Sequence, residues 1–262
     1  MRQQFLFFGG AIMSIPFLPL LAWQGKKIRA NIPSLPEANQ PFDGKIGEGQ
    51  HPIRVLTLGE STIAGVGVEN HQLGISGQLA EELGRLTKHS IYWQVLAKSG
   101  YTAKMVKELL VPQIPKQKFD LIIIGLGGND TFKLNSPGQW RKDFEALIKA
   151  VRLKQSQSKI VIANMPPVGA FPAFTKLMQL VLGNLVRLHG QAIANFPKQF
   201  ENLYYIDKEI RFEEWLNKVE APSSVDSFFS DGVHPSPITY SIWGKEIAKF
   251  IVDQKLVEQK SV

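Results

Sequence analysis

Short apolar runs alternate with longer amphipathic stretches along most of the chain. The runs have the length and the branched or aromatic character of β-strands, and they lie at residues 53–58, 91–97, 121–126, 160–163 and 203–206. Between them, apolar residues recur at helical spacing over residues 76–87, 103–111, 139–151, 174–194 and 240–252. This alternation is typical of a parallel sheet with crossover helices. The pattern predicts one three-layer α/β/α domain around a five-stranded parallel sheet.

The N-terminal segment has a different pattern. From Phe5 to Trp23 it carries no charged residue, and the run is close to the ~20 residues that a helix needs to cross a bilayer. A signal peptide would have a shorter apolar region and small residues at a cleavage point. We therefore expect an uncleaved hydrophobic anchor within residues 1–24, with a cleaved leader as the alternative. Pro16 and Pro19 also leave a bent or half-inserted helix open.

The rest of the chain divides by composition. Residues 25–52 contain several prolines and glycines without apolar periodicity, which indicates an irregular linker. The folded domain is expected at residues 53–255, followed by a tail at 256–262. Basic residues follow the apolar run more often than they precede it, which favours the cytoplasmic face of a membrane for the domain. An extracytoplasmic position is the alternative.

Composition narrows the possible functions. A hydrophobic content of 44% with 20% charged residues excludes general disorder. The absence of cysteine excludes disulfides, thiolate metal sites and a thiol nucleophile. The net charge of +7 comes from scattered residues, which disfavours nucleic acid as a partner. No pair among the five histidines has metal-ligand spacing, so no metal is expected.

Polar residues and glycines follow the first three predicted strands. In an open parallel sheet such positions share one edge, where ligands bind. Ser61 comes after the first strand, Gly100 after the second and Asn129 after the third. A serine hydroxyl beside a backbone N–H and a side-chain amide suits a developing oxyanion. Taken singly, each residue also has a structural interpretation as a helix cap or a turn residue.

A carboxylate and an imidazole lie close together near the C terminus. Asp231 precedes His234 by three residues in a loop bounded by glycine and proline. A carboxylate in this position can accept a hydrogen bond from one ring nitrogen and leave the other to take a serine proton. The alternative is a capping aspartate beside an incidental surface histidine. His189 lies in a predicted helix and is expected to be structural or exposed.

Taken together, these pieces resemble the sequence blocks of the SGNH (GDSL-type) hydrolase family, from about residue 54 to the last helix. Residues 59–61 (Gly-Glu-Ser) resemble the first block, and Gly100 matches the glycine of the second. Residues 127–130 (Gly-Gly-Asn-Asp) and 231–234 (Asp-Gly-Val-His) resemble two later blocks. One position departs from the pattern, because Glu60 stands where the family usually has aspartate.

The resemblance implies a flavodoxin-like fold and a serine esterase that works through an acyl-enzyme without a cofactor. It implies that Ser61 is the nucleophile, that His234 is the general base and then the acid, and that Asp231 orients His234. It also implies an oxyanion hole made by the N–H groups of Ser61 and Gly100 and by the amide of Asn129.

The segment after the fourth strand borders the same edge of the sheet. Its residues Met165, Pro166 and Phe171 are expected to line an acyl pocket, or alternatively to pack on the domain's own helices. We expect the partner to be a small-molecule or lipid-like ester, with a membrane contacted through residues 5–23. A carbohydrate O-acetyl esterase of the same fold and a non-catalytic binding module are the alternatives.

Overall fold

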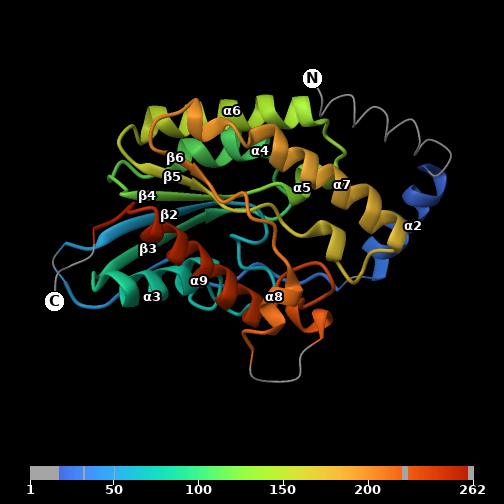
Figure 1. Ribbon diagram of the computed structural model, residues 1–262, viewed down its shortest axis with the longest axis horizontal. Helices are drawn as coiled ribbons and strands as arrows, with labels where there is room; N and C mark the ends of the chain where they lie inside the picture. Colours follow the sequence, from blue (N-terminus) through green and yellow to red (C-terminus); the bar gives the residue numbers. More distant parts are fainter. Residues whose placement is uncertain (1–17, 32, 50, 220–223, 259–262) are drawn as a thin grey trace.

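A six-stranded mixed sheet forms the centre of the protein (Figure 1). The computed structural model describes residues 18–31, 33–49, 51–219 and 224–258. The strand order is β1-β3-β2-β4-β5-β6. In chain order the strands are β1 (Asp43–Ile46), β2 (Ile53–Gly59), β3 (Ile91–Ala97), β4 (Leu121–Gly125), β5 (Lys159–Ile162) and β6 (Leu203–Tyr205).

The prediction of a five-stranded, wholly parallel sheet is wrong in one respect. β2 to β6 are the predicted strands, and they pair in parallel. β1 is an additional edge strand that pairs antiparallel with β3, and it lies within residues 25–52, where an irregular linker was expected. Its four residues, Asp-Gly-Lys-Ile, contain no apolar run, and only Ile46 has a high strand propensity. The strand therefore forms because β3 offers an unpaired edge to it.

Helices cover both faces of the sheet (Figure 1). α3 (Ile75–Thr87) and α9 (Pro237–Asp253) pack together on one face. α4 (Ala103–Met105), α6 (Pro137–Lys154) and α7 (Lys176–Ile193) cover the other. The α6 and α7 helices begin at the side-chain caps Ser136 and Thr175. Three further helices, α2 (Leu18–Asn31), α5 (Gly128–Phe132) and α8 (Phe212–Leu216), lie toward the end that carries the turns after β2 and β4.

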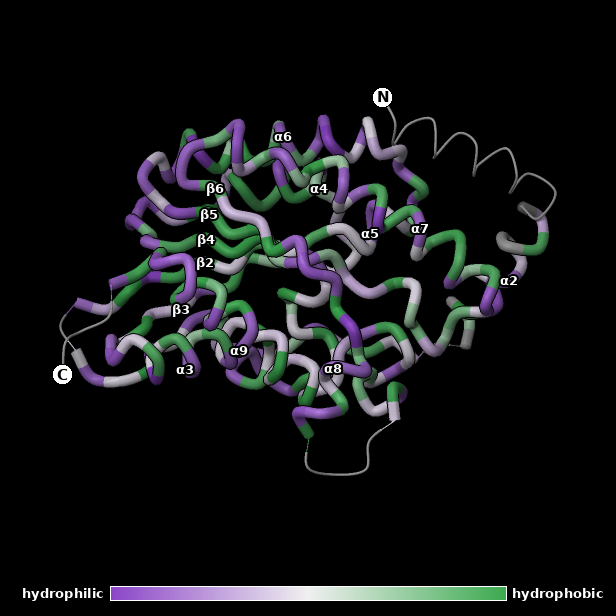
Figure 2. The backbone as a smooth tube through the Cα atoms, viewed as in Figure 1, coloured by the Kyte–Doolittle hydropathy of each residue, from purple (hydrophilic) through white to green (hydrophobic). Residues whose placement is uncertain are grey.

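The central strands are buried on both faces. Figure 2 shows that they consist largely of hydrophobic residues. Alternate residues of one strand enter different cores. In β4, Leu121 and Ile123 pack in the α3–α9 core, whereas Ile122 and Ile124 pack in the α4–α6 core. This two-sided burial explains why the strands read as continuous apolar runs in the sequence.

The predicted helix at residues 103–111 is interrupted. α4 continues as a π-helical turn, η2 (Val106–Leu110), and then as a 3₁₀ turn, η3 (Val111–Gln113). Pro112 lies at the start of this last turn and has no N–H to extend a helix. The periodicity thus placed the apolar residues correctly but not the hydrogen-bond pattern.

The structure gives no support to the expected membrane anchor. Residues 1–17, which make up most of the apolar run, lie outside the described residues. Among the described residues, no helix combines the length and the apolar character that a bilayer span requires. α2 begins at Leu18 and soon contains Gly25, Lys26 and Lys27. The anchor and the membrane localisation therefore stay predictions.

We expect Gly59→Ala to destabilise the fold. A Cβ at residue 59 would collide with the Gly125 carbonyl oxygen and lie 2.6 Å from Ile63 Cγ1. Overpacking of this kind costs about 1–3 kcal/mol, measurable as a lower midpoint of urea unfolding. Gly25→Ala is the matched control, because nothing lies within 4 Å of its Cβ and alanine favours the helix. Equal stability of the two variants would contradict this account of strand packing.

Candidate active site

Three turns meet at one edge of the sheet. β2 pairs in parallel with β3 on one side and with β4 on the other, and Gly59 is opposite Ala97 and Gly125. The chain leaves β2 toward β3 and then crosses to β4, so the order of strands reverses at β2. This is the position at which open α/β sheets bind ligands. The residues that follow these strand ends include Ser61, Gly100 and Asn129, as predicted.

The turn after β2, residues 61–67 (the serine turn), begins with Ser61 and is held by backbone hydrogen bonds. The Glu60 N–H donates to the Gly125 carbonyl at 3.2 Å, and the Val66 N–H donates to the Ser61 carbonyl at 3.1 Å. Ser61 and Thr62 are partly exposed, whereas Glu60 and Ile63 on either side of them are buried. In the part of the chain that the structure describes, its hydroxyl makes no hydrogen bond within the protein. The hydroxyl is therefore available for chemistry.

Asp231 and His234 form a hydrogen-bonded pair. His234 Nδ1 lies 2.7 Å from Asp231 Oδ2, and Asp231 Oδ1 accepts the N–H groups of Val233 and His234 at 2.9 and 2.7 Å. The Asp231 side chain is fully buried, whereas 24% of the His234 side chain is exposed. Burial acts to raise the pKa of Asp231, but the hydrogen bonds and charge interaction with His234 hold it below its ordinary value. Asp231 is thus a carboxylate that fixes the imidazole.

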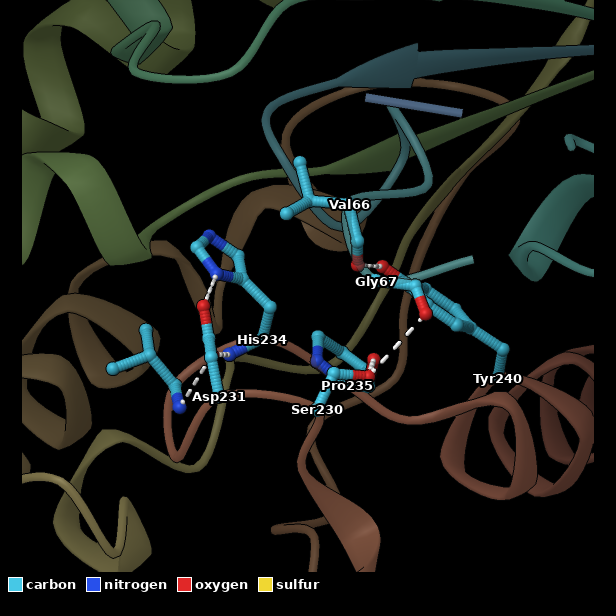
Figure 3. Close-up of polar contacts among 8 residues, drawn as sticks. Val66, Gly67, Ser230, Asp231, His234, Pro235 and Tyr240 are labelled. Atoms are coloured by element: carbon cyan, nitrogen blue, oxygen red, sulfur yellow. Dashed lines mark hydrogen bonds and ion pairs between the residues drawn. The ribbon is translucent and has the colours of Figure 1, made fainter. Parts of the chain in front are cut away.

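The loop of His234 is bound to the turn of Ser61 (Figure 3). The Tyr240 hydroxyl donates to the Val66 carbonyl at 2.8 Å, and the Ser230 hydroxyl lies 3.3 Å from the Gly67 carbonyl. A Cβ at Gly67 would lie 2.7 Å from the Pro235 carbonyl oxygen, so the two backbones are in contact there. Among the described residues no hydrogen bond joins Ser61 to His234.

Asn129 and Gly100 also meet at this edge. The Asn129 amide donates to the carbonyl of Tyr101, the residue after Gly100, at 3.2 Å. Gly100 has φ +83°, which favours glycine, and nothing lies within 4 Å of the position of its Cβ. The backbone of Gly100 therefore borders open space beside the Asn129 side chain. The structure therefore brings these two residues together at this edge of the sheet.

Glu60 lies beneath the serine turn. It is 4% exposed, and its carboxylate accepts three N–H groups: the backbone N–H of Gly128 at 2.8 Å, the backbone N–H of Asn129 at 2.9 Å and the Asn129 amide at 2.5 Å. Burial raises the pKa of Glu60 to about 7 against the effect of these bonds. The sequence marked Glu60 only as a departure from the family pattern, and its partner 69 residues away was not foreseen.

Two other polar residues near this edge have structural roles. Asp130 is buried and accepts from the Ala103 N–H and the Asn135 amide, and burial raises its pKa. His189 is buried between Thr131 and the Asn135 carbonyl, and burial lowers its pKa to about 4. It is therefore neutral, in keeping with the structural interpretation. Among the described residues, no cluster of three acidic or histidine side chains is placed to hold a metal ion.

The predicted pocket residues line two different hollows. Met165 and Pro166 line an open groove of about 540 Å³ between α7 and the loop after β5. Phe171 is buried and, with Pro166, lines a cavity of about 20 Å³ that also touches Thr62 and Val233. Pro166 borders both hollows. The loop therefore lies between the serine turn and the groove.

The comparisons with known proteins agree with this geometry. The model of the GDSL-like Lipase/Acylhydrolase family matches residues 57–242, which include all three turns and the Asp231–His234 pair. The chain belongs to the GDSL-like lipase/acylhydrolase family. Its reaction class is therefore ester hydrolysis. No match was found among curated proteins.

Solved structures of this family and of related esterases share the fold. A lipase/acylhydrolase from Enterococcus faecalis is 20% identical, with a TM-score of 0.54 over 80% of this chain and 99% of its own. A lipase from a goat rumen metagenome is 18% identical, with a TM-score of 0.54 over 75% and 96% of the two chains. A family two carbohydrate esterase from Clostridium thermocellum, solved with cellohexaose, is 14% identical, with a TM-score of 0.54 over 79% and 66%.

The edge of this GDSL-like hydrolase includes one residue that the sequence analysis missed. Glu37, N-terminal to the family match, accepts the Ser99 N–H at 2.7 Å and pairs with Lys98 at 3.0 Å. It thereby holds the turn that presents Gly100. No pattern in the sequence points to this contact, because its partners lie more than 60 residues away.

We expect Tyr240→Phe to weaken the contact between α9 and the turn after β2. It leaves the Val66 carbonyl without its buried donor, which costs about 1–3 kcal/mol. The midpoint temperature of thermal unfolding and the turnover number for ester hydrolysis should both fall. Tyr92→Phe is the control, because its hydroxyl bonds Asp43 at the surface and its loss should change stability by less than about 0.5 kcal/mol. Unchanged stability and turnover in Tyr240→Phe would refute the coupling.

Proposed function

We propose that the protein hydrolyses carboxylic esters through an acyl-enzyme formed on Ser61. The Ser61 oxygen attacks the ester carbonyl while its proton passes to Nε2 of His234. The N–H groups of Ser61 and Gly100 and the Asn129 amide then stabilise the oxyanion. His234 returns the proton to the leaving alcohol, and a water molecule, activated by the same imidazole, releases the acid.

The observation that carries this proposal is the fixed Asp231–His234 pair, whose loop is bonded through Ser230 to the turn after β2. Asp231 accepts from Nδ1, so Nδ1 keeps its proton and Nε2 of the neutral ring is free to accept the serine proton. The lowered pKa of Asp231 keeps it charged, which stabilises the imidazolium that forms during attack.

The groove beside Pro166 supports an ester with an apolar part. Met165, Pro166, Pro167 and Val168 line it, together with charged side chains that include Arg187 and Lys208. A medium or long acyl chain would contact the apolar residues, and polar groups of the substrate would contact the charged ones. The alternative substrate class is an acetylated carbohydrate, because one of the solved structures that share this fold is a carbohydrate esterase.

A fluorophosphonate probe should label Ser61, with the modified residue identified by peptide mass spectrometry. Ser61→Ala should abolish labelling. His234→Ala and Asp231→Asn should slow it by about 10³-fold or more, because both disturb proton transfer from the serine. His51→Ala is the control, since this histidine is exposed and should leave the labelling rate unchanged. A folded wild-type protein that reacts at another residue, or not at all, would refute the triad.

A series of p-nitrophenyl esters separates the two substrate classes. We expect kcat/KM to rise from acetate to octanoate, because each added methylene buried in the groove contributes about 0.8 kcal/mol. Asn184→Trp, which places a bulky side chain in the groove from α7, should lower octanoate hydrolysis about ten-fold more than acetate hydrolysis. Strict preference for acetate together with turnover of acetylated sugars would instead establish the carbohydrate esterase.

A further inference from the structure

Glu60 is a buried carboxylate without a cationic partner. Its side chain forms no ion pair within the described residues, and three N–H groups satisfy its two oxygens. Burying an unpaired charge is costly, and a structural carboxylate more often has a counter-ion or remains exposed. Asn129 supplies two of the three donors, one from its backbone and one from its side chain. The contacts of Glu60 therefore concentrate on one proposed oxyanion donor.

The two N–H bonds of the Asn129 amide are held unequally. One donates to Glu60 Oε2 at 2.5 Å, and the other points to the Tyr101 carbonyl at 3.2 Å. Hydrogen bonds to a charged acceptor are shorter and about twice as strong as neutral ones. The bond to Glu60 thus fixes the plane of the amide. The weaker bond lies on the side of the Gly100 turn, where the substrate oxyanion would form.

We propose that Glu60 is a positioning residue, whose ionised carboxylate orients the Asn129 amide so that its second N–H serves the substrate oxyanion beside the Gly100 N–H. This inference rests on the proposed function. When the oxyanion forms, it replaces the Tyr101 carbonyl as acceptor, while the bond to Glu60 persists. Glu60 itself touches neither the substrate nor the reacting atoms.

The state of charge of Glu60 then regulates the site. Burial raises its pKa to about 7, and the neighbouring Asp130 carboxylate in α5 adds to this rise. A protonated carboxyl has one oxygen that must donate, so it can no longer accept all three N–H groups. The Asn129 amide loses its fixed orientation below about pH 7. Turnover should therefore show an ionisation near pH 7 that belongs to Glu60, in addition to that of the catalytic base.

The raised pKa of Glu60 also determines how the stability of the fold depends on pH. A carboxyl whose pKa is raised in the folded protein binds its proton more tightly there than in the unfolded chain. The stability due to the Glu60 proton is present below about pH 4.5 and is lost as the pH rises to about 7. Ionisation thus favours the proposed catalytic state while it destabilises the fold.

The test compares Glu60→Gln and Glu60→Asp with the wild-type protein in p-nitrophenyl acetate hydrolysis from pH 5 to 9. Glu60→Gln should lower kcat about ten-fold or more, change KM less than three-fold and lose the ionisation near pH 7. Glu60→Asp keeps a carboxylate. It should therefore recover part of kcat, and its kcat should again change with pH as this carboxylate ionises. Glu69→Gln is the matched control, because that side chain is exposed, and its profile should equal the wild type's.

Asn129→Ala provides the second arm, which does not depend on the folding of Glu60→Gln. It removes the amide but leaves Glu60 its two backbone donors. It should lower kcat about 10²–10³-fold and abolish the limb near pH 7. Glu60→Gln added to Asn129→Ala should cause little further loss, because both act through one amide.

Two outcomes overturn the inference. One is a Glu60→Gln enzyme with wild-type kcat and pH profile, and the other is full additivity of Glu60→Gln with Asn129→Ala. Fluorophosphonate labelling separates this failure from failure of the proposed function. If wild-type Ser61 reacts and the Glu60 variants behave as the wild type, the positioning role alone is wrong. If wild-type Ser61 does not react, the triad itself is wrong.

Discussion

The parallel pairing of β2 with a strand on each side is the constraint on which the candidate active site depends. Because Gly59 is opposite both Ala97 and Gly125, the turns after β2, β3 and β4 begin at the same level. The close approach of β2 and β4 leaves no room for a side chain at residue 59, and the Ile63 side chain crowds residue 125. Residues separated by about 70 positions in the chain are thus neighbours. The strand pairing alone brings them together, and no direct contact between their side chains is needed.

Buried carboxylates behave in opposite ways at the two ends of this site. Asp231 has an imidazole partner and two backbone donors, and its pKa lies below the ordinary value. Glu60 has three donors but no cation among the described residues, and its pKa is raised. Both burial and partner contribute to the difference, because Glu60 is the more deeply buried group and Asp231 alone has an imidazole partner. The protein therefore holds one carboxylate firmly charged and another near its titration point.

Much of this arrangement was predictable from the sequence, and the exceptions have physical reasons. Strands buried on both faces produce apolar runs, so β2 to β6 were located to within a residue or two. Ser61, Gly100 and Asn129 could be placed at one edge of the sheet because they follow those runs directly. β1 was missed, because an exposed edge strand of four residues leaves no apolar signature and forms only by pairing with β3. The contacts of Glu60 and Glu37 were missed, because no local pattern specifies a partner more than 60 residues away.

The contact between Glu37 and the turn of Gly100 changes where the catalytic unit begins. The family match starts at residue 57, and the apolar periodicity starts at residue 53. Yet the Glu37 carboxylate accepts the Ser99 N–H, and β1 (Asp43–Ile46) pairs with the edge of β3. A fragment cut at the start of β2 would expose a strand edge and free the turn beside the proposed oxyanion hole. The stretch that resembles a linker is therefore part of the enzyme, and a minimal active version has to retain it.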